Sequence, residues 1–147
     1  MRTIKAKNVV TVLAALFFII TTAASSSADS HAEHSNNPLL DEMVKLNAVF
    51  RDVVSGVSLG NGVRVHEALE VMHGTMERTQ KGVHHGTVTL PKNADHVKEF
   101  FALDKQFHQK LEALAHAAHK NDQNAMLMIT KDLLDRCVQC HRMFRNP

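Results

Sequence analysis

Apolar side chains recur every three or four positions from residue 38 onward, which is the spacing of helices that bury one face. Four stretches carry this pattern: 38–59, 63–81, 94–120 and 122–144. Asn37 followed by Pro38 is a strong helix start, because asparagine caps free N–H groups and proline fits the first helical position. The pattern therefore predicts an all-α fold, an antiparallel up-down-up-down four-helix bundle.

The connections between these stretches are mostly short, which favours antiparallel neighbours. Gly60-Asn61-Gly62 breaks the first stretch, and Asn121-Asp122 forms a turn that caps the fourth. The longest connection, residues 82–93, contains Thr87-Val88-Thr89-Leu90. These residues suit a strand, but the sequence offers them no partner strand, so we expect a loop.

The last stretch ends in Cys137-Val138-Gln139-Cys140-His141, a C-x-x-C-H pattern that contains the only two cysteines of the chain. It is the attachment pattern of a c-type haem, in which two thiols bond the porphyrin and the histidine binds iron. On a helix, positions i, i+3 and i+4 share one face, so all three side chains can point toward one flat ligand. The motif predicts one covalently bound haem c, with Cys137 and Cys140 as attachment points and His141 as an iron ligand.

Three other interpretations of the two cysteines explain less of the motif. A thioredoxin-type redox pair needs a βαβ context, whereas the neighbouring sequence has helical periodicity. A structural zinc site normally has four ligands, and the chain has no second cysteine pair. A plain disulfide leaves the histidine after the second cysteine unexplained.

The N-terminus has the three parts of a secretory signal peptide. Its basic start contains Arg2, Lys5 and Lys7. Residues 9–20 are apolar with one exception, and Ser26-Ser27-Ala28 fits the small-x-small cleavage pattern. The apolar run is shorter than the roughly 20 residues of a membrane span, so an uncleaved anchor is the weaker alternative. We expect residues 1–28 to be removed and the mature protein to be periplasmic, without membrane insertion; bacterial haem attachment takes place outside the cytoplasm.

Removal of the signal peptide changes the charge of the chain. The full sequence has 17 Lys and Arg against 15 Asp and Glu, and its first 28 residues hold three of these bases and no acid. The remainder therefore has 14 bases and 15 acids, with no basic stripe that would bind nucleic acid. Residues 29–37 are polar and predict a flexible lead, and residues 38–147 have the size of one helical domain.

A haem motif on the last of four helices resembles the class II c-type cytochromes, cytochrome c′ and its low-spin relatives. The likeness is closer to the cytochrome b562 family and extends over nearly the whole mature chain. Three segments carry it: Glu42–Asn47 (EMVKLN), Val65–Gly82 (VHEALEVMHGTMERTQKG) and His141–Arg145 (HRMFR). The resemblance implies haem at one end of the bundle core, with Met43 as the second axial iron ligand and Arg145 in contact with a haem propionate.

Two features depart from the cytochrome b562 pattern. Cys137 and Cys140 would convert a dissociable haem into a covalent one, and Asp104 falls on the apolar stripe of the third helix. An unpaired carboxylate is costly to bury. Either the helix is locally rotated or Asp104 lies at the solvent edge of the haem, and the sequence leaves both open.

Several other apolar residues belong in the core of a bundle whatever its function. Four methionines are interpreted as packing residues, since methionine often fills helical cores: Met72, Met76, Met126 and Met128. Five further residues are expected to wall the haem pocket: Leu46, Phe50, Val65, Leu69 and Phe144.

The chain is rich in histidine, with 11 residues of this type. Several are clustered: His31 with His34, His84 with His85, and His108, His116 and His119 on the third helix. Such clusters are able to bind copper, nickel or zinc, although histidines are more often exposed or titrate without a specific task. The sequence leaves a second metal site open.

Three classes of function fit a bundle that carries haem. An electron carrier has both axial positions filled, here by His141 and Met43, and its iron cycles between the ferric and ferrous states. A cytochrome c′-type protein keeps one position open for nitric oxide or carbon monoxide. A haem enzyme needs distal acid–base residues, for which the apolar inner faces offer no clear set. We expect an electron-transfer protein that is not an enzyme and serves periplasmic redox partner proteins, as a monomer or a homodimer.

Overall fold

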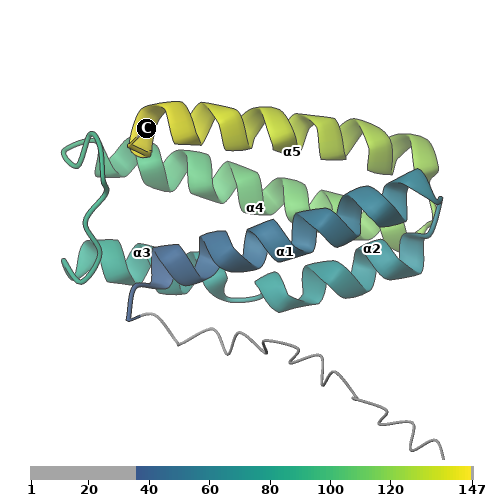
Figure 1. Ribbon diagram of the computed structural model, residues 1–147, viewed down its shortest axis with the longest axis horizontal. Helices are drawn as coiled ribbons and strands as arrows, with labels where there is room; N and C mark the ends of the chain where they lie inside the picture. Colours follow the sequence, from purple (N-terminus) through teal and green to yellow (C-terminus); the bar gives the residue numbers. More distant parts are fainter. Residues whose placement is uncertain (1–35, 147) are drawn as a thin grey trace, which may run out of the picture. The chain divides into compact units, whose positions relative to one another are not determined.

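The computed structural model describes residues 36–146, which belong to one compact unit (Figure 1). Six helical segments follow one another: α1 (Pro38–Ser58), α2 (Gly62–Leu69), the 3-10 turn η1 (Glu70–Met72), α3 (Thr75–His84), α4 (Val97–His119) and α5 (Gln123–Phe144). All regular secondary structure in this range is helical, so the predicted all-α class is confirmed. The predicted signal peptide, and the polar lead up to residue 35, lie outside the described residues.

The segments α2, η1 and α3 follow one another and together form one helical rod. With α1, α4 and α5, this makes four rods that pack against one another. Figure 1 shows the rods running alternately in opposite directions. Helix α4 packs on α5 and α2, while α1 lies against α2 and α3. The predicted arrangement of four packed helices is therefore confirmed. Within residues 36–146, no helix has the length and apolar character needed to cross a membrane.

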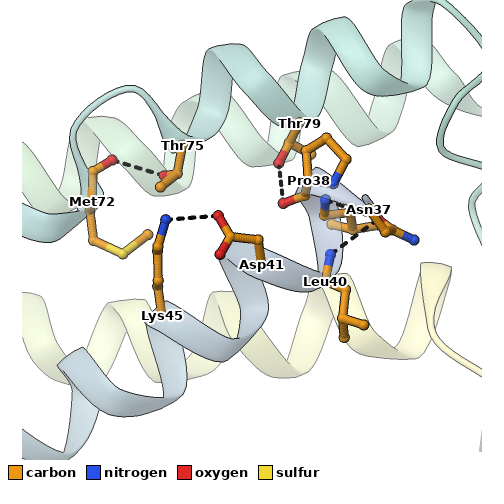
Figure 2. A network of polar contacts seen from close by, with 9 residues as sticks. Asn37, Pro38, Leu40, Asp41, Lys45, Met72, Thr75 and Thr79 are labelled. Atoms are coloured by element: carbon orange, nitrogen blue, oxygen red, sulfur yellow. Dashed lines mark hydrogen bonds and ion pairs between the residues drawn. The ribbon is translucent and has the colours of Figure 1, made fainter. Parts of the chain in front are cut away.

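Helix α1 begins where the sequence predicts it, at Pro38. The side-chain oxygen of Asn37 accepts hydrogen bonds from the N–H groups of Leu39 and Leu40, at 3.1 and 3.2 Å. These bonds satisfy N–H groups that a helix start otherwise leaves free. The hydroxyl of Thr79 on α3 donates to the carbonyl oxygen of Pro38 at 3.3 Å, and so ties α3 to the same end of α1 (Figure 2).

The second helix is not continuous, and the prediction of one helix over 63–81 is wrong. The chain breaks at His73-Gly74, where Gly74 has a φ of 71°. Glycine adopts this left-handed conformation without the steric cost that a β-carbon brings. The hydroxyl of Thr75 then donates to the carbonyl oxygen of Met72 at 2.8 Å, which satisfies a carbonyl at the break (Figure 2).

Two apolar clusters fill the interior. The larger one includes Leu114, Met126 and Leu133, whose side chains are completely enclosed. The smaller one forms around Leu90, Phe100 and Phe144 and includes Cys140 at its edge. The rings of Phe100 and Phe144 meet edge to face, with centroids 5.4 Å apart. This contact joins α4 to the last turn of α5.

A loop joins α3 to α4, as predicted, but it spans residues 85–96 rather than 82–93, because α3 continues through Gly82 to His84. Val88 and Leu90 are buried, and α4 begins at Val97 rather than at Ala94. Two side chains of the loop reach α5: Lys92 donates to the carbonyl oxygen of Arg142 at 3.1 Å, and Asn93 donates to that of Met143 at 2.7 Å. The loop thus holds the C-terminal end of α5.

The register of α5 is tested by two neighbouring leucines. Leu133 is fully buried, whereas Leu134 is 46% exposed. We expect Leu133→Ala to lower the free energy of unfolding by about 2–5 kcal/mol, because it removes enclosed methyl groups and leaves a cavity. The matched control, Leu134→Ala, should lower it by less than about 1 kcal/mol. Urea denaturation followed by circular dichroism measures both, and equal losses would contradict this register.

Candidate functional site

A cavity of about 50 Å³ lies between α1, α4 and α5. Helix α5 lines it with Arg136, Cys137, Cys140 and His141. Helix α4 contributes Phe100, Leu103, Asp104 and Phe107, and helix α1 contributes Met43 and Leu46. The structure therefore brings together the three residues of the C-x-x-C-H motif and Met43, which lies almost a hundred positions earlier in the sequence.

Helix α5 presents the motif on one face. Cys137 packs against the larger apolar cluster and Cys140 against the smaller one, and neither cysteine forms a disulfide. Burial raises the pKa of the Cys137 thiol. It also raises the pKa of Cys140 to about 11, with a further contribution from the negative charge of Asp104. Both sulfurs are therefore protonated thiols at neutral pH, unlike the acidic thiolates of redox enzymes.

His141 lines the cavity and is exposed. Its pKa is lowered, first by partial burial and then by the positive charge of Arg145. The imidazole is therefore neutral at physiological pH, which is the form that binds metal ions.

Met43 is half-buried on α1, and Leu46, one turn further along, lines the same cavity. Of the five predicted wall residues, only Leu46 does so. Phe50, Val65 and Leu69 belong to the larger apolar cluster and Phe144 to the smaller one, while α4 supplies the aromatic walls. Sequence periodicity places such residues on an inward face but does not say which end of the bundle each one faces.

The other methionines are divided by their burial. Met72 and Met126 are core residues, which confirms their interpretation as packing. Met76 is half-buried, and Met128 is 65% exposed, so the packing role assigned to Met128 is wrong. Met128 follows Leu127 on the outer face of α5, where both side chains point to solvent.

Two arginines lie near the motif. Arg145, which resemblance implies for a propionate contact, is exposed just beyond α5 and does not line the cavity. Arg136 does line it, one residue before the motif. Its Nη1 donates to Gln106 at 3.0 Å and its Nε lies 3.5 Å from Asp132. Arg136 could have been found from the sequence, since it lies one turn before Cys140 on the motif face.

Asp104 belongs to a buried polar cluster, which answers the question left open by the sequence. His108 Nε2 lies 2.6 Å from a carboxylate oxygen of Glu42 and 3.7 Å from one of Asp104, and Gln80 donates to Asp104 at 3.2 Å. The helix is therefore not rotated, and Asp104 is not at a solvent edge: its side chain is 9% exposed. Sequence reasoning missed the pairing of Glu42 with His108, because the two residues are 66 positions apart and lie on different helices.

The donor set fits a covalently attached haem, since two thiols, an imidazole and a thioether line one cavity whose other walls are mainly apolar. The enclosed space of about 50 Å³ is smaller than a haem, so binding of the group would require the apolar side chains that line the cavity to move apart.

No protein-family model matches the chain, and no curated protein or solved structure is significantly similar to it. The candidate site therefore depends on the motif residues and on their placement around one cavity.

The pKa of Asp104 predicts a pH-dependent stability. Burial raises this pKa to about 6, with a further contribution from Glu42, while His108 and Gln80 act in the opposite direction and Glu77 adds slightly to the rise. The folded state thus binds this proton more tightly than the unfolded state, so stability falls as the pH rises from about 4 through 6. The raised pKa of His108 acts in the same direction.

We expect the free energy of unfolding of the haem-free protein to fall by about 1–3 kcal/mol more between pH 4 and pH 7 than that of Asp104→Asn. His141, whose lowered pKa makes stability rise with pH, contributes equally to both proteins. Subtracting the pH profile of Asp104→Asn from that of the wild type therefore removes the contribution of His141. Urea denaturation at both pH values measures this difference. Parallel pH profiles would show that Asp104 is solvated.

Proposed function

We propose that the chain is an exported electron-transfer protein of the c type, with one haem attached to Cys137 and Cys140 and with His141 and Met43 as the axial iron ligands. The observation that carries the proposal is that these four side chains, from α5 and α1, line one cavity. A C-x-x-C-H pattern that occurred by chance on a helix would not be expected to share a cavity with a methionine from another helix.

Haem, when bound, supplies an iron that accepts one electron from a donor protein and passes one electron to an acceptor. The protein residues hold that iron in one ligand shell. His141 offers a neutral imidazole because its pKa is lowered. Met43 offers a soft, uncharged sulfur, and His/Met ligation raises the reduction potential.

The walls of the cavity serve the same purpose. Leu46, Phe100 and Phe107 give the cavity apolar walls, and an apolar surrounding favours the less charged ferrous state. Arg136 is a lining cation that suits a propionate group, with Arg145 as the alternative implied by resemblance.

The proposal contains no catalytic residue. Asp104 is the only acidic residue that lines the cavity, and its carboxylate is already engaged by Gln80 and close to His108. The partners we propose are therefore redox proteins of the periplasm rather than a small-molecule substrate or nucleic acid.

Covalent attachment is tested by the two cysteines. In a host with a haem maturation system, haem should stay with the polypeptide through acid–acetone extraction and denaturing electrophoresis. Cys137→Ala/Cys140→Ala should leave haem that extracts freely, because His141 and the apolar walls remain. Val138→Ala, an exposed change inside the motif, is the matched control and should keep the covalent haem. Wild-type protein that never carries covalent haem would overturn the proposal.

The role of Met43 is tested by optical and spin spectroscopy. The oxidised protein should be low-spin and show the weak charge-transfer band of methionine–iron ligation. Met43→Ala should remove that band, lower the potential and open the iron to carbon monoxide. Met76→Ala, a half-buried methionine on α3, is the control and should keep the band. A wild-type protein that is already high-spin and takes up nitric oxide would favour a gas-binding function instead.

A further inference from the structure

A second group of metal-binding side chains comes from α1 and α4, and one of its members, Asp104, also lines the cavity. Glu42, Asp104 and His108 each offer one ligand atom, and these atoms all lie within 4.8 Å of one another. All three side chains are enclosed: Glu42 is 1% exposed, Asp104 9% and His108 12%. None of them has a part in the proposed haem site as a ligand or attachment point.

One atom of the cluster lacks a partner. The Oε1 atom of Glu42 contacts His108, but its Oε2 atom is buried and has no hydrogen-bond partner among the described residues. A buried carboxylate oxygen without a partner has lost its hydration and gained no hydrogen bond in exchange, which destabilises the fold. Such an oxygen is rare in folded proteins and calls for a group that satisfies it.

The charge of the cluster points to a cation. Two carboxylates and one imidazole are enclosed together, and Glu77 adds a further negative potential to Asp104 and His108. Gln80, which donates to Asp104, is neutral. A divalent cation would balance the two carboxylates and would also coordinate the unpartnered oxygen of Glu42.

We propose that Glu42, Asp104 and His108 form a binding site for a divalent transition-metal ion, with Zn²⁺ as the ion that fits best. Zinc accepts one imidazole nitrogen and two carboxylate oxygens at about 2.0–2.2 Å and leaves a fourth position for water. Magnesium and calcium prefer oxygen ligands alone. Ligand atoms around a tetrahedral zinc lie about 3–4 Å apart, so shifts of about 1 Å in the carboxylate groups would complete the geometry.

The site differs from the exposed histidines of the chain. His84 and His85 lie next to each other at the C-terminal end of α3, with tilted rings, and His66 lies beside His119. None of these pairs has a third ligand from His, Cys, Asp or Glu within the described residues. These pairs therefore lack the donors that a tight metal site needs. We expect them to bind Zn²⁺ only weakly.

The test is a Zn²⁺ titration by calorimetry on the mature chain after treatment with a chelator, with and without haem. Wild-type protein should bind one Zn²⁺ at least tenfold more tightly than any further ions, and Zn²⁺ should raise its Tm. Glu42→Gln should weaken the tight site by roughly 100-fold or more and abolish the Tm shift. His116→Ala, which removes an exposed imidazole from the same helix, is the control and should leave both unchanged.

Far-UV circular dichroism checks that Glu42→Gln is folded, and Asp104→Asn gives a second measurement if it is not. Equal Zn²⁺ affinity and stoichiometry in wild type, Glu42→Gln and Asp104→Asn would show binding to surface histidines only and would overturn the proposal. The result does not depend on haem attachment, because no residue varied here is a haem ligand, so the two proposals can fail separately.

Discussion

The three residues of the C-x-x-C-H motif depend on the way α5 packs against α4. Burial of Met126, Leu133 and Phe144 fixes the rotation of α5 about its axis, and this rotation turns Cys137 and Cys140 toward the interior. Because side chains three and four positions apart share a face, His141 follows from the same rotation. The edge-to-face contact between Phe100 and Phe144 holds this arrangement at the C-terminal end. A different register would move both thiols to the surface without altering any helix boundary.

The interior of the bundle is divided into an apolar part and a charged part. Most inward positions are occupied by aliphatic and aromatic residues, as expected for a domain of about this size. Glu42, Asp104 and His108 interrupt them, and their desolvation works against folding. Well-packed apolar residues of similar volume at these positions would cost less to bury. The enclosed charged cluster is therefore not explained by the stability of the bundle alone.

The amino-acid sequence predicted the fold from local signals alone. The cap at Asn37 and the turn at Asn121-Asp122 marked the starts of α1 and α5 correctly, and the three-and-four spacing of apolar residues indicated the all-α class. The break at Gly74 was missed because a single glycine inside a periodic stretch is usually tolerated, and only the backbone angle shows that it ends the helix. The polar cluster was missed because Glu42 and His108 are 66 residues apart and come together only through the tertiary arrangement of the bundle. Local patterns identify elements and motifs, while pairings between helices are decided by tertiary packing.

The loop before α4 has a consequence for the end of the chain. Helix termini ordinarily fray, since their last carbonyl groups lack partners. Here two of those carbonyls, on Arg142 and Met143, accept hydrogen bonds from Lys92 and Asn93, 50 residues earlier in the chain. Opening of the last turn of α5 therefore requires release of the loop as well, so the two segments exchange with solvent as one cooperative unit. The terminus that carries His141 thus has the persistence of a tertiary contact rather than that of a free helix end.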